Sequence, residues 1–240
     1  MDLENAKVLI TGGTLGIGKA TALLLRDAGA QVAITGRNAA RVNAVSSELG
    51  LRGICADVSK QEDVDRTYAE FLDTFGSLDV LVNNAGIGVN RQGQSVHRPL
   101  LELTEQDYWD CFSVNVVGAA MMAKRAAELF VKQNHGDIIN IASTSALKGY
   151  ARGSVYSASK FALKSMNQCW AAELRPHNVR VMLVNPSEVT TAFGNPAGVE
   201  RSEDPKKLRS EEIAHAIKSC LEMDNRGFVP EMTVFATNPF

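Results

Sequence analysis

Residues 7–18 read Lys-Val-Leu-Ile-Thr-Gly-Gly-Thr-Leu-Gly-Ile-Gly, and this stretch decides the fold. The apolar run over 7–11 predicts a short buried strand, which the Gly12-Gly13 pair ends. Apolar residues with helical spacing follow over 18–28 and stop at Gly29. A glycine-rich turn between a buried strand and a helix is typical of the first βα unit of a parallel sheet.

The same alternation continues to the C-terminus. Further strands are expected at 31–35, 51–56, 79–82, 137–142, 179–184 and 232–236, and further helices at 39–49, 61–75, 105–133 and 153–175. This pattern predicts a three-layer Rossmann-type α/β sandwich, in which a parallel sheet of about seven strands carries helices on both faces. Because no repeat or linker divides the chain, residues 1–240 are expected to form a single domain.

Composition excludes several classes of function. The net charge of −2 offers no basic field for nucleic acid or an anionic membrane. No apolar run reaches the ~18 residues that span a bilayer, and no secretory signal is recognisable, so a cytoplasmic protein is expected. The four cysteines are expected to be reduced and mostly buried, and the four scattered histidines predict no metal site.

Glycine or polar residues follow each of the first six predicted strands. They are Gly12-Gly13, Gly36-Arg37, Asp57, Asn83-Asn84-Ala85-Gly86, Ser143 and Asn185-Pro186. In an open parallel sheet, ligands bind outside the carboxyl ends of the strands. We therefore expect these residues to line one shared cleft.

The glycine spacing predicts a dinucleotide at the first of these positions. Gly12, Gly16 and Gly18 let the backbone approach a pyrophosphate, and the following helix offers free N–H groups. The GxxxGxG spacing differs from the more familiar GxGxxG. On this motif alone, a glycine-rich turn that binds no ligand is therefore an alternative interpretation. After the second strand, Gly36 replaces the carboxylate that selects NAD, and Arg37 can pair with a 2′-phosphate. NADP is therefore favoured over NAD, although an exposed arginine at a helix entry is the alternative.

Tyr156 and Lys160 are the candidate catalytic pair. Spaced by four residues on one predicted helix, they share a face, and the ammonium is expected to lower the pKa of the phenol. A pKa nearer the working pH suits acid–base catalysis. Tyr-x-x-x-Lys alone also fits an exposed helix pair, but Ser143 stands at a strand end where its hydroxyl can hold a substrate oxygen.

With the motifs Thr11–Gly18, Asn83–Gly86, Ser143 and Tyr156–Lys160 in this order, the chain resembles the short-chain dehydrogenase/reductase family, most closely its 3-oxoacyl-(acyl carrier protein) reductase type. The resemblance implies that Asn115 anchors a water in a proton relay and that Ser143 orients the carbonyl. It further implies that Tyr156 donates the proton and that Lys160 lowers its pKa and holds the nicotinamide ribose. Two long helices, 105–133 and 153–175, would pack against other subunits in a homodimer or homotetramer.

The resemblance also implies the residues that contact the cofactor. They are Gly12, Thr14, Leu15, Gly16, Ile17, Gly18, Gly36, Arg37, Asp57, Val58, Asn84, Ala85, Gly86, Tyr156, Lys160, Pro186, Val189 and Thr191. The chain departs from the family at two points: Ser187 replaces the glycine that usually follows Pro186, and Leu15 replaces a basic residue that some NADP-dependent relatives carry. The first departure weakens any substrate assignment, and the second leaves Arg37 to supply most of the phosphate preference.

The expected function is an NADPH-dependent carbonyl reductase or alcohol dehydrogenase, with a 3-oxoacyl thioester as one candidate substrate. The alternatives are an NAD-dependent dehydrogenase of a sugar, steroid or other secondary alcohol, a non-catalytic dinucleotide-binding regulator, and a nucleotide-sugar epimerase or dehydratase. The irregular stretch 187–209 is expected to be a mobile segment over the site. We expect Arg91, Arg98 and Arg152 to be solvated and Trp109 and Trp170 to pack in a core or a subunit interface.

Overall fold

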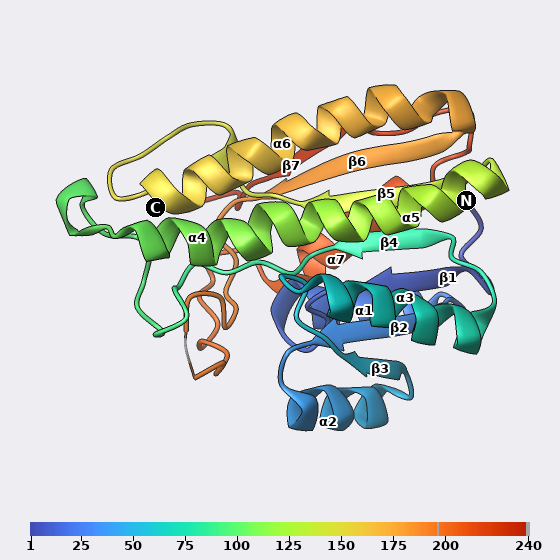
Figure 1. The fold of residues 1–240 in the computed structure, drawn as a ribbon, viewed down its shortest axis with the longest axis horizontal. Coiled ribbons are helices and arrows are strands. Elements are labelled where there is room, and N and C mark those ends of the chain that lie inside the picture. The colour runs from blue at the N-terminus through green and yellow to red at the C-terminus, as the bar shows by residue number, and fades with distance from the viewer. Residues whose placement is uncertain (196, 239–240) are drawn as a thin grey trace.

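The computed structural model describes residues 1–195 and 197–238, so Pro196 of the irregular stretch lies outside the described residues. Within them, one parallel sheet has the strand order β3-β2-β1-β4-β5-β6-β7, as Figure 1 shows. The strands are β1 Lys7–Ile10, β2 Gln31–Gly36, β3 Arg52–Cys55, β4 Val80–Asn83, β5 Gly136–Ile141, β6 Val179–Pro186 and β7 Glu231–Val234. The prediction of a seven-stranded parallel sheet is confirmed. The strand order reverses between β1 and β4, which is where such sheets bind ligands.

Helices cover both faces of the sheet. They are α1 Gly16–Asp27, α2 Ala39–Leu49, α3 Gln61–Phe75, α4 Glu105–Phe112, α5 Ala119–Gln133, α6 Ser154–Leu174 and α7 Ser210–Glu222, with short 3-10 turns η1 Leu100–Glu102, η3 Thr144–Ala146 and η4 Arg175–His177. Successive strand residues face opposite sides, so Val8 and Ile10 pack with α1, α2 and α7, whereas Leu9 packs with α3 and α5. In Figure 1, α5 and α6 cross in front of the sheet.

Two helical features differ from the predictions. The expected helix 105–133 is interrupted by a π-helical turn, η2 Ser113–Gly118, which separates α4 from α5. The helix α7 was not predicted, although Ile213, Ile217 and Leu221 recur at a spacing of four and are fully buried. This helix packs along α1 and closes that face of the sheet. The Met1 ammonium caps it by donating to the Leu221 carbonyl at 2.6 Å.

Several side chains lie elsewhere than expected. The expected solvation of Arg98 is wrong, because it pairs with the fully buried Asp107 of α4. Arg91 is half-exposed but pairs with the buried Asp110 at 3.3 Å, and Arg152 is exposed. Trp109 is 64% exposed and so lies outside the core. The cysteines are free, but only two are buried, because Cys55 and Cys169 are exposed. No helix in the described part of the chain combines the length and apolar character needed to cross a membrane.

Candidate active site

The turn after β1 is locked to the end of β4. The Thr11 hydroxyl accepts hydrogen bonds from the backbone N–H groups of Asn84 and Ala85, both at 3.0 Å. In return, the Asn84 side chain donates to the carbonyls of Thr11 and Gly12. A Cβ on Gly18 would lie 2.4 Å from the Gly12 oxygen, so only glycine permits this approach. The predicted residues Gly12, Gly18, Asn84 and Ala85 therefore meet.

The start of α1 carries an anion in this structure. Gly16 has φ +51° and donates its backbone N–H to a carboxylate oxygen of Glu200 at 2.8 Å. Glu200 comes from the loop between β6 and α7, and its carboxylate stands in for an anionic ligand at a helix N-terminus. A cofactor phosphate fits the same donor. Thr191 also packs here, because a Cβ on Gly16 would lie 3.0 Å from its methyl group.

The ends of β2 and β3 form the far part of the same edge. Gly36 lies against Thr14, since an added Cβ would approach the Thr14 methyl group to 2.9 Å. Arg37 is exposed at the start of the loop into α2. After β3, the Asp57 carboxylate accepts the Ser59 N–H and hydroxyl at 3.0 and 2.7 Å, and Val58 is buried. These residues lie at the strand ends where the sequence predicts the adenosine half of a cofactor.

Tyr156 and Lys160 lie on the first turns of α6, and both are buried. The Lys160 ammonium donates to the Ile141 carbonyl at the end of β5, at 2.9 Å, and lies 5.7 Å from the centre of the Tyr156 ring. Ser143, two residues after β5, lies near enough to Tyr156 to influence the phenol's pKa, and its hydroxyl accepts the Ser145 N–H at 3.1 Å. The structure therefore brings together the predicted phenol, amine and hydroxyl.

Burial changes the proton affinities of this pair in opposite directions. It raises the pKa of the Tyr156 phenol above its ordinary value, although the nearby Ser143 hydroxyl acts against the shift. Burial also lowers the pKa of Lys160 to about 8. The expectation that the ammonium lowers the pKa of Tyr156 is thus wrong for this structure. Loss of water from around the phenol is the main cause of the raised pKa, and the Lys160 amine donates to the Ile141 carbonyl instead of to the phenol.

Asn115 lies in the π-helical turn, and π-helical turns are frequent at functional sites. Its side-chain oxygen accepts the Ile87 N–H at 2.8 Å, and its nitrogen donates to the Ile87 carbonyl at 3.0 Å. The same nitrogen lies 3.2 Å from the Cys111 sulfur and 3.1 Å from the Ser159 hydroxyl. Asn115 therefore fixes the segment after β4 beside the catalytic pair. Sequence reasoning missed these three partners, which come from separate segments.

Three aromatic residues near Tyr156 were also missed. The rings of His97 and Phe193 lie 5.2 and 5.4 Å from the Tyr156 ring, measured between centroids. The Tyr150 hydroxyl lies 3.3 Å from Nδ1 of His97. Each of the three belongs to a different loop, so no local sequence pattern predicts that they lie close together.

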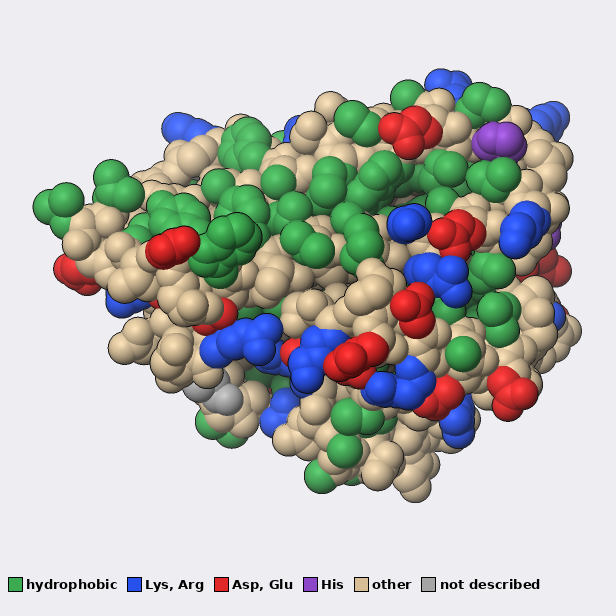
Figure 2. Space-filling model, in the orientation of Figure 1, with side chains coloured by type: hydrophobic (Ala, Val, Ile, Leu, Met, Phe, Trp, Pro, Cys, Tyr) green, Lys and Arg blue, Asp and Glu red, His purple; other side chains and the backbone are tan. Residues whose placement is uncertain are grey.

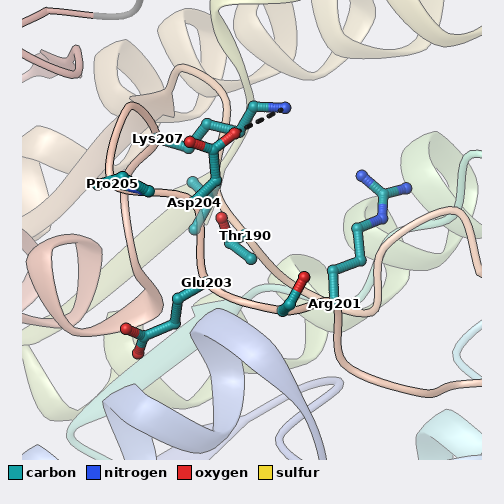
Figure 3. A pocket seen from close by; sticks show the side chains of 8 residues that line it. Thr190, Arg201, Glu203, Asp204, Pro205 and Lys207 are labelled. Carbon is teal, nitrogen blue, oxygen red and sulfur yellow. Dashed lines mark ion pairs between the residues drawn. The ribbon is translucent and has the colours of Figure 1, made fainter.

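A charged hollow of about 590 Å³ opens within the loop between β6 and α7, shown in Figure 3. Its lining residues are Val189, Thr190, Arg201, Ser202, Glu203, Asp204, Pro205 and Lys207. Asp204 and Lys207 form an ion pair across it at 3.9 Å. Of the predicted cofactor residues, only Val189 lines this hollow, and neither Tyr156 nor Lys160 does. The described residues contain no cluster of three or more acidic, cysteine or histidine side chains suited to a metal.

Comparison with known proteins agrees with this geometry. The family described as short chain dehydrogenase matches residues 6–202. An uncharacterized oxidoreductase of Staphylococcus aureus (strain MRSA252) is 33% identical over 236 residues, which cover 97% of each chain.

Solved structures are also similar to this chain. A 3-ketoacyl-(acyl-carrier-protein) reductase from Brucella melitensis, complexed with NADH, has a TM-score of 0.87 and 27% identity, and covers 99% of this chain and 100% of its own. An alcohol dehydrogenase from the archaeon Thermococcus sibiricus, complexed with 5-hydroxy-NADP, has a TM-score of 0.84 and 26% identity over 97% of both chains. Both neighbours bind a nicotinamide dinucleotide.

Proposed function

The chain belongs to the short-chain dehydrogenase family and is an NAD(P)-dependent oxidoreductase, and from this premise we propose that it reduces a ketone or aldehyde with NADPH. The observation that carries the proposal is the group formed by the partly buried Ser143, just after β5, and the buried Tyr156 and Lys160 at the start of α6. A 3-oxoacyl thioester is one candidate substrate, because a 3-ketoacyl-(acyl-carrier-protein) reductase is among the structural neighbours.

The proposed chemistry divides the work between the cofactor and the protein. When bound, the nicotinamide dinucleotide supplies a hydride to the carbonyl carbon. The Ser143 hydroxyl holds the carbonyl oxygen, and the Tyr156 hydroxyl gives that oxygen its proton, so the product is an alcohol. A pKa of about 8 lets Lys160 exchange a proton near neutral pH and restore the phenol. Oxidation of the alcohol follows the same path in reverse.

The test of this function replaces Tyr156 by Phe. Loss of the only acid in contact with the carbonyl is expected to lower kcat by about 10²–10⁴-fold, with an unchanged Kd for NADPH. The matched control is Tyr108→Phe, which removes a hydroxyl from a partly buried ring of the same apolar cluster. Full activity of Tyr156→Phe contradicts the mechanism. Wild-type protein that binds NADPH but reduces no carbonyl supports the non-catalytic regulator instead.

Arg37 is the proposed source of NADPH preference. It is exposed beyond Gly36, where no carboxylate opposes a 2′-phosphate. Arg37→Ala is expected to weaken NADPH binding by about tenfold or more and to leave NADH binding unchanged, since a charged hydrogen bond contributes about 1.5–3 kcal/mol. Arg52→Ala, which removes an exposed arginine paired with Glu70, is the control. Equal loss for both cofactors contradicts the assignment and favours the NAD-dependent alternative.

We also propose a homodimer or homotetramer formed through α5 and α6. Figure 2 shows apolar side chains in a band along these helices. Val131 of α5, Phe161 of α6 and Val117 of the adjoining η2 are each more than a third exposed. A hollow of about 560 Å³ between the helices includes Ala127 and Trp170 in its lining. A surface of this kind is typical of a subunit interface. Light scattering of Val131→Glu and Phe161→Glu is expected to show smaller particles than wild type, and unchanged mass contradicts this interface.

A further inference from the structure

Three loops meet over Tyr156 and each brings one aromatic ring. His97 comes from the segment between β4 and α4, Tyr150 from the turn before α6, and Phe193 from the loop after β6. Two of these rings meet at Gly88, where an added Cβ would lie 2.8 Å from the Phe193 ring and 3.3 Å from Nε2 of His97. The absence of a side chain at this glycine therefore lets two of the rings approach Tyr156.

The rings are held in place by hydrogen bonds. His97 and Tyr150 stack with an interplanar angle of 19°, and the Tyr150 hydroxyl bonds to the imidazole. The Phe193 N–H donates to the Thr191 hydroxyl at 3.1 Å, and its carbonyl accepts from Arg201 at 3.0 Å. The backbone of Phe193 is thus fixed on both sides while its ring remains 37% exposed. This leaves an oriented apolar surface that a ligand can reach.

We propose that His97, Tyr150 and Phe193 are the specificity-determining wall of the active site, and that they select a carbonyl attached to a flat, unsaturated ring. The proposal rests on the proposed carbonyl reduction. A flat ring bound against Tyr156 packs face or edge onto the wall, and aromatic pairs gain energy beyond the area they bury. A puckered saturated ring of equal carbon number buries similar area without that gain.

The charge of the wall agrees with an apolar ligand. Burial lowers the pKa of His97 below its ordinary value, so the imidazole is neutral at neutral pH. The nearby arginines Arg91 and Arg98 are paired with Asp110 and Asp107. These two cations are paired with buried carboxylates, and a third, Arg201, donates to the Phe193 carbonyl. The ring faces of the wall are therefore uncharged.

The experiment compares two ketones of eight carbons, acetophenone and cyclohexyl methyl ketone. With NADPH, wild-type kcat/KM is expected to favour acetophenone. Phe193→Leu keeps an apolar side chain but removes the flat ring, and is expected to lower the ratio of the two kcat/KM values by about three- to tenfold. Comparing this ratio between wild type and variant cancels the different intrinsic reactivities of the two ketones, because they enter both ratios equally. Phe235→Leu, which removes a 64% exposed ring outside the wall, is expected to leave the ratio unchanged.

A second variant, Gly88→Ala, displaces the Phe193 ring without removing it and is expected to lower the same ratio. Thermal unfolding of each variant shows whether it is folded. The proposal is overturned if both variants keep the wild-type ratio, or if wild type turns over neither ketone while reducing another carbonyl. Either result leaves the proposed function standing. If NADPH reduces no carbonyl at all, the proposed function itself fails.

Discussion

The two parts of the candidate site, the β1 turn and the surroundings of Tyr156, are held together by different kinds of contact. At the cofactor end, backbone groups and two short side chains, Thr11 and Asn84, lock the β1 turn to β4. At the substrate end, the buried acids Asp107 and Asp110 tie the loop that carries His97 to α4. His97 and, from another loop, Phe193 lie with their rings close to Tyr156.

This difference shows how one fold keeps its cofactor and changes its substrate. Few residue types satisfy a turn in which a Cβ would meet a carbonyl oxygen at 2.4 Å, so the cofactor end is restricted. At the substrate end, by contrast, a loop position a few residues from an anchoring ion pair can accept many different side chains. Substitutions should therefore separate the two ends, each affecting the binding of one ligand.

The largest effect is expected from Asp107→Asn at the substrate end. This fully buried carboxylate accepts hydrogen bonds from Thr104, Asn90 and Arg98. Removing its charge leaves Arg98 without its counter-ion, at a cost of about 3 kcal/mol in the free energy of unfolding. Urea titration measures this loss, and the Kd for NADPH is expected to stay unchanged. A large rise in that Kd would show that the two ends are coupled.

The pH dependence of this variant provides a check. Burial acts to raise the pKa of Asp107, but the hydrogen bonds from Thr104 and Asn90 and the charge of Arg98 hold it below its ordinary value. A carboxyl with a lowered pKa stabilises the fold above its unfolded pKa of about 4, and that contribution disappears as the pH falls through the folded value. The difference between wild type and Asp107→Asn should therefore shrink in acid.

The cofactor end is tested by Gly18→Ala. The added methyl group would lie 2.4 Å from the Gly12 oxygen and 2.5 Å from the Asn84 amide, so the turn must open. We expect a loss of about 1–3 kcal/mol in stability and a rise of about tenfold or more in the Kd for NADPH. Gly149→Ala is the control, because nothing lies within 4 Å of its Cβ position. Unchanged NADPH binding by Gly18→Ala would contradict the role of the turn.

Lys160 lies where the two ends meet, and Lys160→Met tests its burial. Because the folded pKa of about 8 lies below the ordinary 10.5, the fold disfavours the charged amine. The free energy of unfolding of the wild type should therefore increase as the pH rises from the folded pKa of Lys160 toward its ordinary value. Methionine does not titrate, so the variant lacks this increase. Relative to Lys160→Met, wild type is expected to gain about 2 kcal/mol in free energy of unfolding between about pH 7 and pH 10. A constant difference would mean that the amine is hydrated.

The smallest effect is expected from Glu200→Gln. The carboxylate occupies the Gly16 N–H, to which a cofactor phosphate is proposed to bind, so it competes with the cofactor. Removing its charge should tighten NADPH binding by about two- to fivefold, since charges at a helix end contribute about 0.3–1 kcal/mol. Calorimetry at low salt measures the change, with Glu203→Gln from the same loop as control. Weaker binding would show that Glu200 supports the cofactor instead.

The same contrast explains what could be predicted from sequence. The β1 turn and Asn84 were identifiable because backbone geometry restricts the residue types at those positions. Tyr156, Lys160 and Ser143 were identifiable by spacing and order along the chain.

The convergence of His97, Tyr150 and Phe193 depends on the paths of three loops, which no local periodicity encodes. Whether the pKa of Tyr156 is raised or lowered depends on its burial, and the spacing of four residues to Lys160 does not reveal that burial. By contrast, α7 was missed although its apolar spacing was present in the sequence.

The packing of α7 on α1 has a consequence for synthesis. Ala22 and Leu25 of α1 are fully covered in the folded chain, and much of their cover comes from a helix that begins about 180 residues later. While the ribosome is still translating that region, the first βα unit therefore has an apolar flank open to chaperones and to other nascent chains. The first βα unit carries the glycine-rich turn that is simplest to recognise in the sequence, yet its apolar flank is among the last surfaces of the molecule to be buried.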